Sequence, residues 1–85
     1  MRNAIFLQVK EILSKINGQI DAGRELTLDT KWRDLGMDSL QTIDFIVAVE
    51  DSFDFVIPDD DLLIQDQWMK TLGSIVSYIQ QHIHA

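Results

Sequence analysis

Apolar residues recur every three or four positions in three stretches of the chain, which is the spacing of amphipathic helices. Plotted at about 100° per residue, those of the first stretch fall on one stripe: Ile5, Val9, Ile12, Leu13 and Ile16. Asn17 and Gly18 follow as a stop signal. The pattern therefore predicts a first helix over residues 4–17.

The second helix has a capping signal at its start. Asp38 is a favourable N-cap, and Gln41 follows three residues later, as in a capping box. A helix is thus predicted from Ser39 to about Phe53. Its core-facing side is predicted to consist of Thr42, Phe45, Ile46, Val49 and Phe53.

Two more helices and one long loop complete the prediction. Pro58 precedes a short helix predicted over Asp59 to Ile64, and Thr71 caps a last helix. The core stripe of that last helix is Leu72, Ile75, Val76, Ile79 and Ile83. Residues 18–38 form a long connection, and its apolar side chains are predicted to pin it under the bundle: Leu26, Leu28, Trp32 and Leu35. No segment alternates for long like a strand, so we expect an all-α bundle with three principal helices, one short third helix and a long first loop.

The side of the 39–53 helix opposite its core face mixes apolar and acidic residues. It carries Leu40, Ile43, Asp44, Val47, Glu50 and Asp51. An ordinary surface helix would be polar here. The stripe is typical of a docking surface, with apolar contacts for affinity and acids for steering. The alternative is that Ile43 is half-buried and Leu40 lies under the loop.

Composition and charge narrow the possible functions. The 85 residues are 46% hydrophobic and 25% charged, which is ordinary for one folded domain over residues 1–85. A chain of this length is too short to enclose a large active site as well as a core. The formal net charge is −7, which excludes nucleic acid as a partner. Residues 34–66 hold ten acids and no Lys or Arg, which indicates either basic partners or a solvated face. The sequence contains no Cys, and neither a signal peptide nor a membrane span is evident, so a cytoplasmic protein is expected.

Ser39 is the candidate for chemical modification. At the start of a helix, unpaired N–H groups and the positive end of the dipole would stabilise a phosphate ester. From the helix start alone, a second capping hydroxyl is the favoured role for a Ser beside an N-cap.

The run Asp34-Leu35-Gly36-Met37-Asp38-Ser39-Leu40 resembles the signature of the acyl carrier protein family. The likeness continues without a gap through Ile57 and Pro58-Asp59, about eighteen residues beyond the serine, and is found again at Thr71 and Tyr78-Ile79. It implies a four-helix fold and no enzymatic activity. It also implies that a separate Mg²⁺-dependent phosphopantetheinyl transferase attaches 4′-phosphopantetheine from coenzyme A to Ser39, with the assistance of Asp38.

The resemblance further implies the partners and the cargo. The outer stripe of the 39–53 helix would bind basic patches on loading ligases, acyltransferases and synthases, and the carrier would be a monomer. Gln41 stands where many fatty-acid carriers have an acid, and Phe45 where they have a smaller aliphatic residue. A Trp at position 68 resembles the D-alanyl and other aminoacyl carriers more than the fatty-acid type. We expect a small acyl or aminoacyl cargo in preference to a long chain, because rigid rings fill the core.

Three other functions are weighed against a carrier. A nucleophilic enzyme would need Ser39 to meet His82 or His84, which lie near the end of the last helix without a sign of an oxyanion site. Calcium binding at Asp59-Asp60-Asp61 lacks the alternating acids, Gly and terminal Glu of an EF-hand, so no metal site is predicted. An acidic helical interaction module without a prosthetic group remains the alternative.

Overall fold

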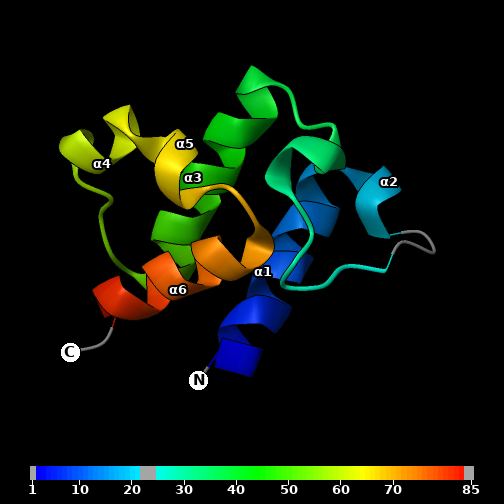
Figure 1. Ribbon diagram of the computed structural model, residues 1–85, viewed down its shortest axis with the longest axis horizontal. Helices are drawn as coiled ribbons and strands as arrows, with labels where there is room; N and C mark the ends of the chain where they lie inside the picture. The colour runs from blue at the N-terminus through cyan, green and yellow to red at the C-terminus, as the bar shows by residue number, and fades with distance from the viewer. Residues whose placement is uncertain (1, 22–24, 84–85) are drawn as a thin grey trace.

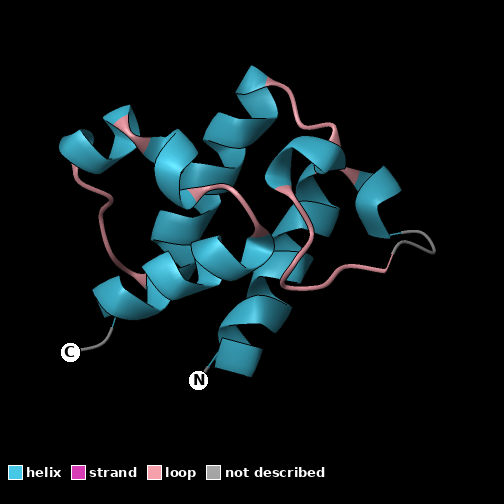
Figure 2. Ribbon diagram, in the orientation of Figure 1, coloured by secondary structure: helices cyan, strands magenta, loops and turns pink. Residues whose placement is uncertain are grey.

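Three long helices form the bundle in the computed structural model, which describes residues 2–21 and 25–83. They are α1 (Arg2–Ile16), α3 (Ser39–Phe53) and α6 (Leu72–Ile83) (Figure 1). Shorter elements join them: α2 (Gly18–Asp21), the 3₁₀ helix η1 (Trp32–Leu35), α4 (Asp59–Leu63) and α5 (Gln65–Trp68). Helices and loops account for all of the described chain, apart from one isolated bridge between Lys31 and Thr71 (Figure 2). The predicted all-α bundle with three principal helices is confirmed.

Helix α1 packs against α6, α3 and α2, so the core lies where the three long helices meet. Its fully buried side chains include Val9, Leu13, Phe45, Leu72 and Ile79. Every apolar position predicted for the first stripe is buried or packed against this core. Among the described helices, none is both long and apolar enough to cross a membrane.

Both predicted helix caps are present. Asp38 Oδ1 accepts a hydrogen bond from the Gln41 N–H (2.8 Å), and Gln41 Oε1 accepts one from the Asp38 N–H (3.3 Å). At α6, Thr71 Oγ1 accepts from the Ser74 N–H, and Ser74 Oγ accepts from the Thr71 N–H, each at 3.0 Å. These reciprocal pairs satisfy amides that a helix start leaves without partners, and they fix where α3 and α6 begin.

The connection predicted over residues 18–38 joins α1 to α3, but it is not a loop throughout, because it contains α2 and η1. Helix α1 ends at Ile16, and the chain turns at once into α2, whose Ile20 is fully buried. Burial of one large apolar side chain explains why four residues stay helical here. Residues 22–24, which include Gly23 of the predicted loop, lie outside the described residues, as does His84.

Leu28 does not pin the loop by its side chain, contrary to prediction, since 36% of it is exposed. The main chain does so instead, because the Gly73 N–H donates to the Leu28 carbonyl at 2.7 Å. A Cβ on residue 73 would lie 2.9 Å from that oxygen, so the close approach requires glycine. Leu26, Trp32 and Leu35 do pack on or in the core as predicted.

The short helix predicted from Asp59 to Ile64 is present as α4, and it is followed by a second short helix, α5, that was not predicted. Helix α4 ends at Leu63, and α5 starts after Ile64, whose N–H bonds to the Asp61 carbonyl in a tight turn (3.2 Å). In α5, the Trp68 indole N–H donates to the Asp61 carbonyl at 3.0 Å. This bond ties the end of α5 back to α4.

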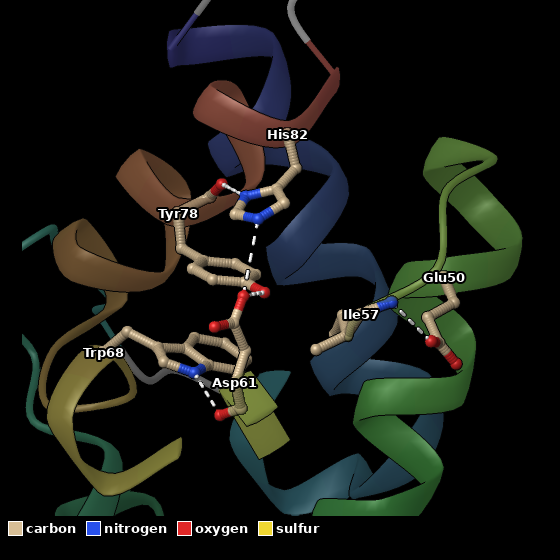
Figure 3. A network of polar contacts seen from close by, with 6 residues as sticks. All are labelled: Glu50, Ile57, Asp61, Trp68, Tyr78 and His82. Atoms are coloured by element: carbon tan, nitrogen blue, oxygen red, sulfur yellow. Dashed lines mark hydrogen bonds and ion pairs between the residues drawn. The ribbon is translucent and has the colours of Figure 1, made fainter. Parts of the chain in front are cut away.

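Stacked rings attach α5 to α6, and a hydrogen bond to Asp61 attaches α4 (Figure 3). The Tyr78 ring lies between Trp68 and His82, with centroid distances of 4.0 and 4.1 Å. The Tyr78 hydroxyl donates to Asp61 Oδ2 at 2.6 Å. Burial raises the pKa of Tyr78 well above its usual value, and the hydrogen bond to Asp61 and the negative charges of Asp61 and Glu50 raise it further.

Candidate functional site

Ser39 is the first residue of α3 and is exposed. Its hydroxyl makes no hydrogen bond with any other residue in the described ranges, so the predicted alternative of a second capping hydroxyl has no support. The N-cap bond is made by Asp38, which uses the amide of Gln41. The amides of Ser39 and Leu40 therefore stay available at the positive end of a 15-residue helix. A phosphate ester on the Ser39 oxygen fits this geometry.

The residues that precede Ser39 are anchored in the core. Leu35 is buried in the core, and Met37 packs against it in part. Between them Gly36 ends η1 with φ +71°, a left-handed conformation that glycine adopts without strain. The exposed Ser39 is therefore carried on a fixed turn rather than on a free loop.

The outer stripe of α3 is exposed as predicted. The exposed fractions of Leu40, Ile43 and Val47 are 73%, 57% and 56%. The alternative, with Ile43 half-buried and Leu40 under the loop, is therefore wrong. Asp44 and Asp51 are exposed on the same helix, so apolar and acidic groups share one accessible face.

Glu50 differs from the other acids of this stripe. It is half-buried, and its Oε2 accepts a hydrogen bond from the Ile57 N–H at 2.7 Å (Figure 3). The bond ties α3 to the loop that leads into α4, and it lets Ile57 enter the core. Glu50 thus has a structural role that the sequence prediction did not include.

The residues considered for other chemistry are engaged elsewhere. His82 stacks on Tyr78, and its Nε2 lies 3.5 Å from Asp61 Oδ2. Asp61 itself binds the Tyr78 hydroxyl and does not join Asp59 and Asp60 in a cluster. In residues 2–21 and 25–83, no group of three or more His, Asp or Glu is arranged to hold a metal ion.

A groove of about 680 Å³ lies between η1, α3, α5 and the turn before α6. Thr42, one turn along α3 from Ser39, lines it together with Lys31, Arg33 and Lys70. No role for these cations was predicted from the sequence. The available signal was that Arg33 and Lys70 are the first basic residues on either side of the all-acid stretch.

Comparison with known proteins shows the family of the chain. The family described as the phosphopantetheine attachment site matches residues 8–79. The chain belongs to the acyl carrier protein family. An acyl carrier protein of Exiguobacterium sibiricum is 34% identical over 83 residues, which cover 96% of this chain and 98% of that protein. One of Clostridium perfringens is 35% identical over 80 residues (92% of this chain, 96% of that protein). The mitochondrial acyl carrier protein of Saccharomyces cerevisiae is 39% identical over 59 residues (68% of this chain, 44% of that protein).

Membership of the acyl carrier family fixes the general role of the molecule. The chain is a carrier and not a catalyst, and its prosthetic group is 4′-phosphopantetheine. Such a carrier domain interacts with a phosphopantetheinyl transferase and with synthesis enzymes. Its own residues therefore need only hold the arm, present it and bind the partners.

Proposed function

We propose that Ser39 carries the phosphopantetheine arm and that the protein presents acyl or aminoacyl thioesters on it to partner enzymes. The observation that carries the proposal is the exposed Ser39 hydroxyl, which makes no hydrogen bond with other described residues at the N-terminus of α3. The fixed turn at Gly36 supports it too, because the attachment point is held at a defined position on the bundle.

The residues around Ser39 would divide the work simply. Asp38 fixes the first turn of α3 through its bond to the Gln41 amide and stands beside the hydroxyl that is to be modified. The first-turn amides would stabilise the phosphate charge. When bound, the arm supplies a terminal thiol that holds the cargo as a thioester, and its tether raises the cargo's effective concentration at each partner.

The outer stripe of α3 is proposed as the docking face for the transferase, for loading ligases and for acyltransferases or synthases. Support comes from three exposed apolar side chains next to exposed Asp44 and Asp51. Arg and Lys on a partner would be steered by these acids, while Leu40, Ile43 and Val47 would supply apolar contact area. Glu50 contributes negative charge, but its carboxylate already holds Ile57.

The proposed cargo is a small acyl or aminoacyl group. Phe45 is fully buried and contacts Trp32, with 4.8 Å between the ring centroids. Displacing packed rings to admit a long chain would cost about 1–3 kcal/mol or more. Trp68 is less informative about cargo than its sequence position suggested, because it packs on Tyr78 and bonds to Asp61.

The test is the intact mass after incubation with coenzyme A, Mg²⁺ and a broad-specificity transferase. The protein should gain one phosphopantetheine, and Ser39→Ala should gain none while staying folded. Ser52→Ala is the matched control, because Ser52 is also an exposed serine on α3 and its variant should be modified like the wild type. A wild-type mass that never changes would favour the interaction module without a prosthetic group.

A further inference from the structure

The groove beside Ser39 gathers positive charge in a protein whose net charge is −7. Lys31, Arg33 and Lys70 line it, and all three are exposed. Asp66 also lines the groove, yet no ion pair within 4.0 Å joins Asp66 to these cations. In the part of the chain that the structure describes, none of the three basic side chains has a hydrogen-bond partner. Three like charges in one groove repel one another, so an anion bound among them would be stabilised.

Paired backbone segments hold the main chain of two of these residues side by side. Lys31 and Thr71 form the isolated antiparallel bridge of the fold. The Trp32 N–H donates to the Lys70 carbonyl, and the Leu72 N–H donates to the Thr30 carbonyl, each at 2.9 Å. The Lys31 and Lys70 backbones are therefore fixed next to each other, although the residues are far apart in the sequence. The charge cluster is built by the fold and does not depend on a free loop.

The groove combines this charge with apolar surface. Trp32 and Met69 line it, and both also pack on or in the core. Thr42 lines its α3 side and lies three residues after Ser39, which is about 4.5 Å along the helix axis. A group tethered to Ser39 can thus fold back over α3 and reach the groove. Short methylene chains suit Trp32 and Met69, and a terminal anion suits the cations.

We propose that this groove binds the free terminal carboxylate of a short dicarboxylic acyl group carried on the arm. The inference rests on the proposed attachment at Ser39 and narrows the cargo from small acyl or aminoacyl groups to acyl groups with a terminal carboxylate. Exposed charge pairs are individually weak. The contact needs little intrinsic affinity here, because a short flexible tether holds the carboxylate at an effective concentration of the order of millimolar.

The charge of the groove discriminates between cargoes. An aminoacyl group carries an ammonium, which Lys31, Arg33 and Lys70 would repel. A neutral acyl chain of the same length would touch Trp32 and Met69 but leave the three cations without a counter-charge. The phosphate of the arm is bonded directly to the serine and has the first-turn amides of α3 as its nearest donors. Of the groups on the arm, the distal carboxylate fits the groove best.

The experiment compares three loaded forms of the ¹⁵N-labelled carrier, bearing succinyl, butyryl or alanyl thioesters, by NMR. Succinyl and butyryl have the same number of carbons and differ in the terminal carboxylate. The Trp32 indole N–H reports on the groove, and the Trp68 indole N–H, which is bonded to Asp61, is an internal control. Succinyl should shift the Trp32 indole and Lys70 amide signals at least about twofold more than butyryl or alanyl, as partial occupancy by a tethered group predicts. The Trp68 signal should not discriminate between the cargoes.

A charge-matched pair of variants tests the cations. Lys70→Gln should remove most of the succinyl-specific shift, and Arg33→Gln should act in the same direction. Lys15→Gln removes the same charge from α1, which contributes no residue to the groove, and should leave the shift intact. A second measurement needs no variant: raising the salt from 0.1 to 1 M shortens the screening length from about 10 to 3 Å, and the succinyl-specific shift should shrink.

The loaded mass is measured before each spectrum, so the two proposals fail in different ways. A protein that cannot be loaded at Ser39 contradicts the proposed function. A fully loaded carrier that gives the same Trp32 and Lys70 shifts for succinyl and butyryl overturns the inference about the groove. Equal losses in Lys70→Gln and Lys15→Gln would also overturn it, because they would show a long-range charge effect rather than a site.

Discussion

Replacing Asp38 separates the structural role of this residue from its proposed role in modification. Asp38→Ala removes the 2.8 Å bond from the Gln41 amide to Asp38 Oδ1, and it keeps the backbone N–H of residue 38 that donates to Gln41 Oε1 at 3.3 Å. Losing an N-cap of this kind costs about 0.5–2 kcal/mol, typically about 1. For a domain of 85 residues, about 1 kcal/mol lowers Tm by roughly 4–8 °C. Because α3 supplies buried Phe45, Ile46 and Val49, the loss should appear as lower global stability.

The assay is thermal and urea unfolding followed by circular dichroism. Asp38→Asn should melt close to the wild type, since Asn caps about as well as Asp. Ser39→Ala should stay within about 0.5 kcal/mol, because it removes only an exposed hydroxyl without a hydrogen-bond partner among the described residues. An Asp38→Ala protein that melts at the wild-type temperature would refute the capping argument.

The Asn variant then tests the second role of Asp38. If the carboxylate assists the transfer of phosphopantetheine, this folded variant should be modified more slowly than the wild type at equal transferase concentration. Modification at the wild-type rate would limit Asp38 to capping. The stability measurement keeps the two roles apart, because slow modification of an unfolded variant would not count.

Three further outcomes are expected. Asp44→Lys and Asp51→Lys should slow association with loading and acceptor enzymes, and the defect should shrink at high salt because exposed charges are screened. Stopped-flow association rates that match the wild type in both variants would show that the outer stripe of α3 is not the docking face. Phe45→Ala should lower the free energy of unfolding by about 3–5 kcal/mol in urea titrations, because it empties a fully buried site, and a loss below about 1 kcal/mol would contradict the packed core. The raised pKa of Tyr78 means that the folded state favours the neutral phenol, so the free energy of unfolding should be intact below about pH 10 and fall as the pH rises above that value. Tyr78→Phe should flatten this fall in pH-dependent unfolding. An unchanged slope in the variant would show that the buried Tyr78 hydroxyl is not the cause of the fall.

Local signals in the sequence were sufficient for much of the fold. The start of α3 followed from Asp38 and Gln41, because a capping box depends only on residues three apart. The stripes of α1 and α6 followed from helical spacing, and the exposed stripe of α3 was found because three apolar residues fell on its polar side. Ser39 was singled out by its place at the helix start together with the resemblance of residues 34–40 to the acyl carrier protein signature.

What was missed depends on contacts between distant parts of the chain. The Tyr78 hydroxyl meets Asp61 across 17 residues, and only packing of α4 on α6 brings them together. Glu50 bonds to the Ile57 amide because the chain turns back after α3, where Asp54 adopts a left-handed conformation (φ +57°). The helical turn at Ile20 was hidden by the Asn17-Gly18 stop signal.

The groove shows the same dependence on the fold. Lys31 and Lys70 are brought together by the bridge between Lys31 and Thr71, which no periodicity in the sequence predicts. The charge count over residues 34–66 also does not reveal the groove, because the cations that line the groove lie just outside that stretch.

The measurement that tests the carrier assignment most directly is peptide mapping of the modified protein. Trypsin cuts after Lys and Arg, and none lies between Arg33 and Lys70, so Ser39 and Ser52 share the peptide 34–70. After incubation with coenzyme A and the transferase, fragmentation of this peptide should place a single phosphopantetheine on Ser39. A modification on Ser52 or on another peptide, or a fully folded protein that gains no mass, would contradict the account.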